Sequence, residues 1–229
     1  MILVGSLVGY LLVVMGIGAL VNRLLLPIFG RGWRLFVAPG VVAHELAHAL
    51  ACVVTGAPVL DINFWKASGG HVIHGPPRLH IIGPVFISFA PMILMTLGLF
   101  VFVPVLSPGL ANLTWTQHVP SSLTQLVGGY LASLILAIKS FDWRTITPWL
   151  LTYAMLNVAV TMTPSGIDLK NAQWAFAACL IVAALIGRLL AVSVSAAVLW
   201  PPAATSLILL GMALIVAVII AVLARLVRR

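Results

Sequence analysis

The sequence predicts an all-α membrane protein, a bundle of six to seven transmembrane helices with one small extended hairpin. Of its 229 residues, 62% are hydrophobic and only 7% are charged, whereas soluble domains are about half apolar and roughly a quarter charged. Several apolar runs approach the roughly 20 residues that a helix needs to cross a bilayer. Because neither an internal repeat nor a soluble linker interrupts them, we expect residues 1–229 to form one domain within the lipid bilayer.

Seven apolar runs are candidates for the membrane spans, separated by short polar or Pro/Gly-bearing links. Six of them are expected to be true spans. The fourth run is short and contains Gly128 and Gly129, so a re-entrant segment is the alternative there. The runs cover residues 2–21, 35–60, 79–106, 122–138, 147–162, 172–199 and 203–223.

The basic residues indicate topology and not nucleic-acid binding. The net charge is +8, but the Lys and Arg residues are scattered among short links and form no basic face. Arg23, Arg31 and Arg34 are expected to fill the first loop, and three arginines end the chain, so both regions are predicted to be cytoplasmic. The first run lacks the basic start of a secretory signal and is expected to be retained as a span. These features predict a multi-pass protein of the cell membrane.

Two short extended pieces follow the second run. Residues 59–65 and 68–73 have strand-like composition about a turn and predict a small hairpin. Trp65 and Lys66 are residue types that anchor at lipid headgroups, so a plain interfacial hairpin is one interpretation of this segment.

The sequence HELAH at residues 44–48 lies inside the second apolar run. On a helix, His44 and His48 share one face, where both imidazoles can bind one Zn²⁺, and Glu45 can act as general base. A carboxylate in hydrocarbon costs several kcal/mol, so Glu45 in this environment indicates a function. The motif therefore predicts zinc chemistry inside the membrane.

A catalytic zinc usually has three protein ligands and one open position. Glu45 is the only glutamate, so no other glutamate can complete the site. Ala51 and Val54 occupy the positions where a metzincin would have glycine and a third histidine. The third ligand is therefore sought among the aspartates and the remaining histidines.

Of the three aspartates, Asp168 fits best. Asp61 lies thirteen residues after His48, about 20 Å along a continuous helix, and Asp142 lies in a polar loop with basic neighbours. Asp168 follows a Pro/Gly break between two apolar runs, just as His44 follows Pro39 and Gly40. The zinc is then expected near the start of two parallel helices, close to the cytoplasmic face, in a site built from residues 35–60 and 147–192. The next candidates are His71, His74 and His80.

The chain resembles the site-2 protease family of intramembrane zinc metalloproteases in three places. HELAH is similar to the zinc-binding helix of that family, Gly83-Pro84 is similar to its A-G-P segment, and residues 163–168 are similar to the motif whose aspartate completes the zinc site. The chain departs from the family at Ile82, where alanine is usual, at the missing second proline, and at Leu169, which replaces a glycine. These departures suggest a divergent member.

The resemblance implies a zinc metalloendopeptidase with one Zn²⁺ per chain, which hydrolyses peptide bonds within or next to transmembrane segments of membrane proteins. It also implies that a sheet edge at Gly69, Gly70 and His71 receives the substrate as a strand. Asn157 or Thr161, near the position of a family asparagine, can hydrogen-bond the substrate backbone or the oxyanion. Each can equally be a polar residue of helix packing.

Two other functions are consistent with intramembrane His and Asp residues. A metal-ion transporter would need polar residues in several spans, whereas here the ionisable residues centre on HELAH and leave Glu45 without an obvious role. A catalytically inactive relative would bind membrane helices without cleaving them, although the residues needed for cleavage are present.

Overall fold

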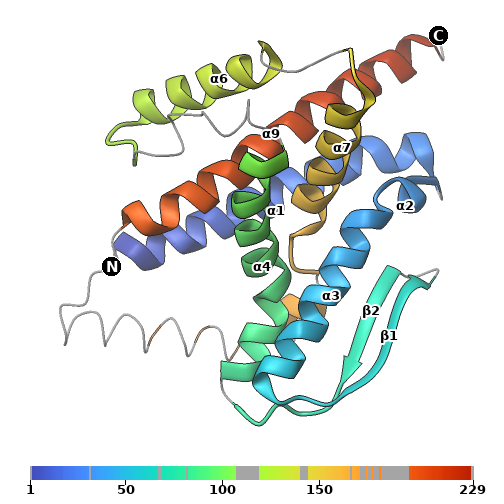
Figure 1. Ribbon diagram of the computed structural model, residues 1–229, viewed down its shortest axis with the longest axis vertical. Helices are drawn as coiled ribbons and strands as arrows, with labels where there is room; N and C mark the ends of the chain where they lie inside the picture. The colour runs from blue at the N-terminus through green and yellow to red at the C-terminus, as the bar shows by residue number, and fades with distance from the viewer. Residues whose placement is uncertain are drawn as a thin grey trace.

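The computed structural model describes residues 2–30, 32–66, 69–80, 82–106, 119–139, 144–165, 167–170 and 196–227, together with residues 174, 177 and 181. These residues form a helical bundle with one two-stranded sheet at its side (Figure 1). The elements are α1 (Ile2–Phe29), α2 (Gly32–Phe36), α3 (Ala38–Thr55), β1 (Val59–Lys66), β2 (Gly69–His74), α4 (Ile82–Leu106), α6 (Leu123–Lys139), α7 (Ile146–Thr161) and α9 (Ala196–Val227).

Four of the described helices, α1, α3, α4 and α9, are long and apolar enough to cross a membrane. This agrees with the prediction of a helical membrane protein. Helices α6 and α7 are apolar but shorter, with 17 and 16 residues. The predicted number of six to seven spans is not confirmed, and the predicted run 172–199 falls mostly outside the described residues.

Three predicted boundaries are wrong. The break predicted between residues 199 and 203 lies inside α9, which contains Pro201 and Pro202 and continues from Ala196 to Val227. The first helix does not end at residue 21, because the leucines after Arg23 continue it to Phe29, and Gly30 ends it with a positive φ of 52°. Arg23 therefore lies on α1 and not in a loop. The second span is shorter than predicted, because Gly56 ends α3 with a φ of 69° and donates its backbone N–H to carbonyls of the last turn. Residues 59–60 then already belong to β1.

The main core lies among α1, α4, α7 and α9, around fully buried side chains such as Val14 and Ile208. Helix α3 packs against α4 and α7. At Gly40, an added Cβ atom would lie 2.4 Å from the carbonyl oxygen of Asn157 on α7. Glycine is therefore required where α3 crosses α7 closely.

The predicted hairpin is present. Strands β1 and β2 pair antiparallel, with Ile62 opposite Val72 and Asn63 opposite His71. Both strands lie alongside α3, as Figure 1 shows. Because the described sheet contains two strands, each strand has one edge that no other described strand pairs with.

Candidate metal centre

Helix α3 carries the two histidines and the glutamate of the HELAH motif. Pro39 lies in its first turn, where the missing N–H of proline leaves no helical hydrogen bond unmade. His44 and His48 are one turn apart and face the same way, so their Nε2 atoms lie 3.2 Å apart. Glu45 lies between them in sequence and is buried, with 6% of its surface exposed.

Each histidine is oriented by a main-chain carbonyl from another helix. The Nδ1 atom of His44 lies 2.6 Å from the carbonyl oxygen of Thr161 at the end of α7. The Nδ1 atom of His48 lies 2.8 Å from the carbonyl oxygen of Ile87 on α4. A carbonyl can only accept, so both Nδ1 atoms carry the proton, and in neutral imidazoles both Nε2 atoms then present lone pairs.

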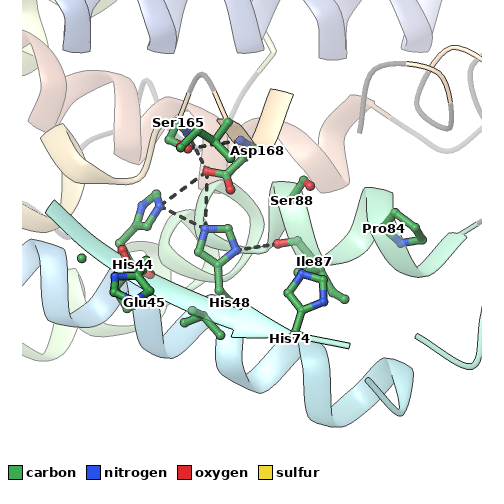
Figure 2. A pocket seen from close by; sticks show the side chains of 13 residues that line it. His44, Glu45, His48, His74, Pro84, Ile87, Ser88, Ser165 and Asp168 are labelled. Atoms are coloured by element: carbon green, nitrogen blue, oxygen red, sulfur yellow. Dashed lines mark hydrogen bonds and ion pairs between the residues drawn. The ribbon is translucent and has the colours of Figure 1, made fainter. Parts of the chain in front are cut away.

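Asp168 reaches the histidines from a separate segment (Figure 2). Helix α7 ends at Thr161, and residues 167–170 are again helical. The Asp168 Oδ2 atom lies 3.5 Å from Nε2 of His48 and 3.9 Å from Nε2 of His44. The structure thus brings together the three side chains that were predicted as ligands.

Ser165 holds the Asp168 carboxylate through two reciprocal hydrogen bonds. The Ser165 N–H donates to Oδ2 at 2.7 Å, and the Asp168 N–H donates to the Ser165 hydroxyl oxygen at 3.2 Å. This is a capping box. Burial raises the pKa of the Asp168 carboxyl, but His48, when a second proton on Nε2 makes it a cation, and the hydrogen bonds of Ser165 lower it more, so its pKa lies below the usual value. The carboxylate is therefore charged at neutral pH.

The three side chains could hold a metal ion, and their separations can be compared with those in a zinc site. Tetrahedral zinc with ligands at about 2.0–2.1 Å separates those ligands by about 3.3 Å. The three observed separations, 3.2, 3.5 and 3.9 Å, lie close to this value. The Nε2 lone pairs of the two histidines and the Asp168 carboxylate oxygen face one another. Because these electron-rich atoms repel each other, a positive charge must lie among them, either a proton or a metal ion. Among the described residues, three His, Cys, Asp or Glu side chains lie close enough together to share a metal ion: His44, His48 and Asp168.

A cavity of ≈ 290 Å³ opens at the three ligands. Its walls come from α3, from β2 between Gly70 and His74, from α4 at Pro84, Ile87 and Ser88, and from the Asp168 turn. Gly70 lies directly against Glu45, because an added Cβ atom would lie 2.6 Å from the glutamate Oε1. A molecule in this cavity can therefore contact the candidate metal ligands, Glu45 and β2 at once.

Asn157 and Thr161 lie on α7 where it crosses α3, and neither lines the cavity. Asn157 is buried and donates its side-chain N–H to the carbonyl oxygen of Tyr153, while its Oδ1 atom has no hydrogen-bond partner among the described residues. The Thr161 hydroxyl donates to the Asn157 carbonyl oxygen. Thr161 contacts the site through its main-chain carbonyl oxygen, which accepts the hydrogen bond of His44 Nδ1. A substrate or oxyanion role for either side chain stays a prediction.

The other predicted candidates lie outside the ligand group. His71 Nε2 is 3.2 Å from Asp61 Oδ2 across the hairpin, and His74 contacts the carbonyl of Gly75 through Nδ1. Both line the cavity. His80 is exposed and contacts the carbonyl of Arg78, while Asp142 lies outside the described residues. Gly69 begins β2, next to Gly70.

Two features of the site were missed in the sequence. The spacing of Ser165 and Asp168 matches the S-x-x-D signature of a capping box, which would have identified Ser165 as the residue that holds the carboxylate. The carbonyls of Ile87 and Thr161 have no such signature, because any residue supplies a carbonyl and only the packing of helices selects one.

No protein-family model, curated protein or solved structure significantly matches this chain. The fold and the site therefore define its class: a helical membrane protein with a candidate metal centre built from His44, His48 and Asp168.

Proposed function

We propose that this protein is an intramembrane zinc metalloendopeptidase of the site-2 protease type. It would hydrolyse peptide bonds within or next to transmembrane segments of membrane proteins, with one zinc ion per chain. One observation carries the proposal. The buried Glu45 lies next to His44 and His48 on a helix apolar enough to cross a membrane, and Asp168 completes a triangle with the two histidines. A transporter gains nothing evident from Glu45, whereas peptide hydrolysis needs a base at that place.

His44, His48 and Asp168 would hold the metal, and Glu45 would move the proton. Zinc bound there would polarise a peptide carbonyl and make water nucleophilic near neutral pH. Glu45 takes the proton that the attacking water loses and then donates it to the leaving amine. Gly70 packs against the Glu45 side chain and so restricts its position.

A substrate helix must unwind before its peptide bonds can be hydrolysed, because its amides are hydrogen-bonded within the helix. Strand β2 offers a place for the unwound segment, since its residues Gly70, His71, Val72 and His74 line the cavity beside Glu45. We propose that the open edge of the sheet at Gly69, Gly70 and His71 pairs with the substrate backbone. The pairing would hold one peptide bond next to the ligand triangle.

The proposed location is the cell membrane, with the site accessible from the cytoplasm. Arg34, just before α3, and Arg225, near the end of α9, support this orientation through the positive-inside rule. His44 and His48 lie near the middle of α3 (Ala38–Thr55), so the metal centre would be about halfway along this span and not near its start, and water would reach it through the cavity that the two histidines line.

The decisive experiment compares the purified protein with its Glu45→Gln variant on a panel of transmembrane substrates. Gln is close in size to Glu but cannot accept the proton, so cleavage should fall to background while bound zinc is retained. Removal of zinc by a chelator should abolish cleavage by the wild-type protein, and added zinc should restore it. Equal cleavage by the two proteins would overturn the mechanism. Transport of zinc into proteoliposomes, unaffected by Glu45→Gln, would favour the transporter.

A further inference from the structure

Asp168 lies in a helical segment, of which residues 167–170 are described as one continuous stretch. Ile167 and Lys170 of this stretch are exposed. Asp168 and Leu169 are the half-buried residues of this stretch, so contacts of these two side chains with the bundle can set the place of the carboxylate.

Within residues 167–170, Leu169 is the apolar side chain that packs on the bundle. Its side chain is half-buried and packs on the cluster around Leu11 of α1 and Phe89 of α4. Met15, Val85 and Met92 belong to the same cluster, so the contact is formed by two long helices. Leu169 immediately follows Asp168, and a shift of one therefore moves the other.

The residues that precede Asp168, Met162 and Thr163, also contact α1 and α4. Met162 is fully buried and accepts a hydrogen bond from Thr96 of α4. Thr163 packs on Gly18 of α1, where an added Cβ atom would lie 2.9 Å from the threonine methyl group. Residues on both sides of Asp168 therefore contact α1 and α4.

We infer that Leu169 is a positioning residue for the metal centre: its packing between α1 and α4 fixes Asp168 within reach of His44 and His48. The inference rests on the metal centre of the proposed function. It also gives a physical meaning to a departure from the resembled motif, which has glycine at this position, since glycine has no side chain with which to make this contact.

The inference is tested by the zinc affinity of the full-length protein in detergent, measured with zinc alone against a competing chelator. Leu169→Ala should weaken zinc binding roughly 10-fold or more, as for other residues that orient a ligand. Leu169→Met, which keeps the apolar volume, should stay close to wild type, and Leu169→Val should be intermediate. Lys170→Ala changes the exposed neighbour and should have no effect.

A matched control separates positioning from general loss of packing. Leu134 is a buried leucine on α6, which contacts α9 and lies away from the site (Figure 1). Leu134→Ala should lower thermal stability and leave zinc affinity unchanged. Equal zinc affinity of wild type, Leu169→Ala and Leu169→Val, or equal weakening by Leu134→Ala, would overturn the inference. Failure of the wild-type protein to bind zinc would instead overturn the metal centre itself.

Discussion

His44 and His48 face each other through Nε2 atoms 3.2 Å apart, while each directs its Nδ1 atom to a carbonyl of a different helix. His44 is oriented by α7 and His48 by α4, although both histidines lie on α3. The ligand geometry is therefore set where three helices meet. Changes in helix packing should alter metal binding even where they touch no ligand.

Asp168→Ala should lower bound zinc toward zero, because two histidines on one helix leave the metal without its only charged ligand. The measurement is the molar ratio of zinc to purified protein. Asp61→Ala is the control, since Asp61 is an exposed carboxylate that contacts His71 outside the ligand group, and it should retain the wild-type ratio. A stoichiometric zinc content in the Asp168→Ala protein would remove Asp168 from the site.

Gly70→Ala should reduce peptidase activity and leave the zinc content unchanged. The added methyl group would lie 2.6 Å from the Oε1 atom of Glu45, so the glutamate or the hairpin must move. A displacement of about 1 Å at a reacting group can cost roughly 100-fold in rate. Ile73→Ala is the control, because Ile73 lies on the same strand but does not line the cavity. Unchanged activity of Gly70→Ala would argue against Glu45 as the base in this position.

The local parts of this site could be predicted from sequence. His44 and His48 share a face through helical periodicity alone, and Asp168 was found by elimination because acidic residues are so few. The hairpin followed from its extended, turn-bounded composition. The rest depends on contacts distant in sequence: the carbonyls of Ile87 and Thr161 become partners only when α4 and α7 pack on α3.

The helix ends show the same limit. Arg23 was interpreted as loop because it is charged, yet it lies on α1. A single charged residue does not end a helix when apolar residues continue the pattern, whereas a glycine with positive φ does, as at Gly30 and Gly56. Boundaries at these glycines could have been predicted from their residue type, and the continuation through Arg23 could not.

Ser165→Ala should weaken zinc binding without abolishing it. The substitution removes the hydroxyl that accepts the Asp168 N–H but keeps the Ser165 N–H that donates to the carboxylate. Loss of such a cap costs about 1 kcal/mol, which corresponds to roughly a fivefold change in an equilibrium constant. Ser165→Thr keeps a hydroxyl at the cap and should bind zinc nearly as tightly as wild type. The check is chelator competition on all three proteins, and equal affinities would show that the capping box does not act on the metal centre.

Gly40→Ala should destabilise the protein and weaken zinc binding together, because α3 and α7 are in close contact at Gly40, one helical turn before His44. The new methyl group would meet the carbonyl oxygen of Asn157 at 2.4 Å, and a backbone atom cannot rotate away as a side chain can. Overpacking of this kind costs about 1–3 kcal/mol. Gly98→Ala on α4 is the matched control, since nothing lies within 4 Å of its added methyl group; it should stabilise the helix by up to about 1 kcal/mol. Thermal unfolding in detergent and chelator competition measure the two effects. If Gly40→Ala lowered stability while zinc affinity stayed at the wild-type value, the ligand geometry would not depend on the packing of α3 against α7.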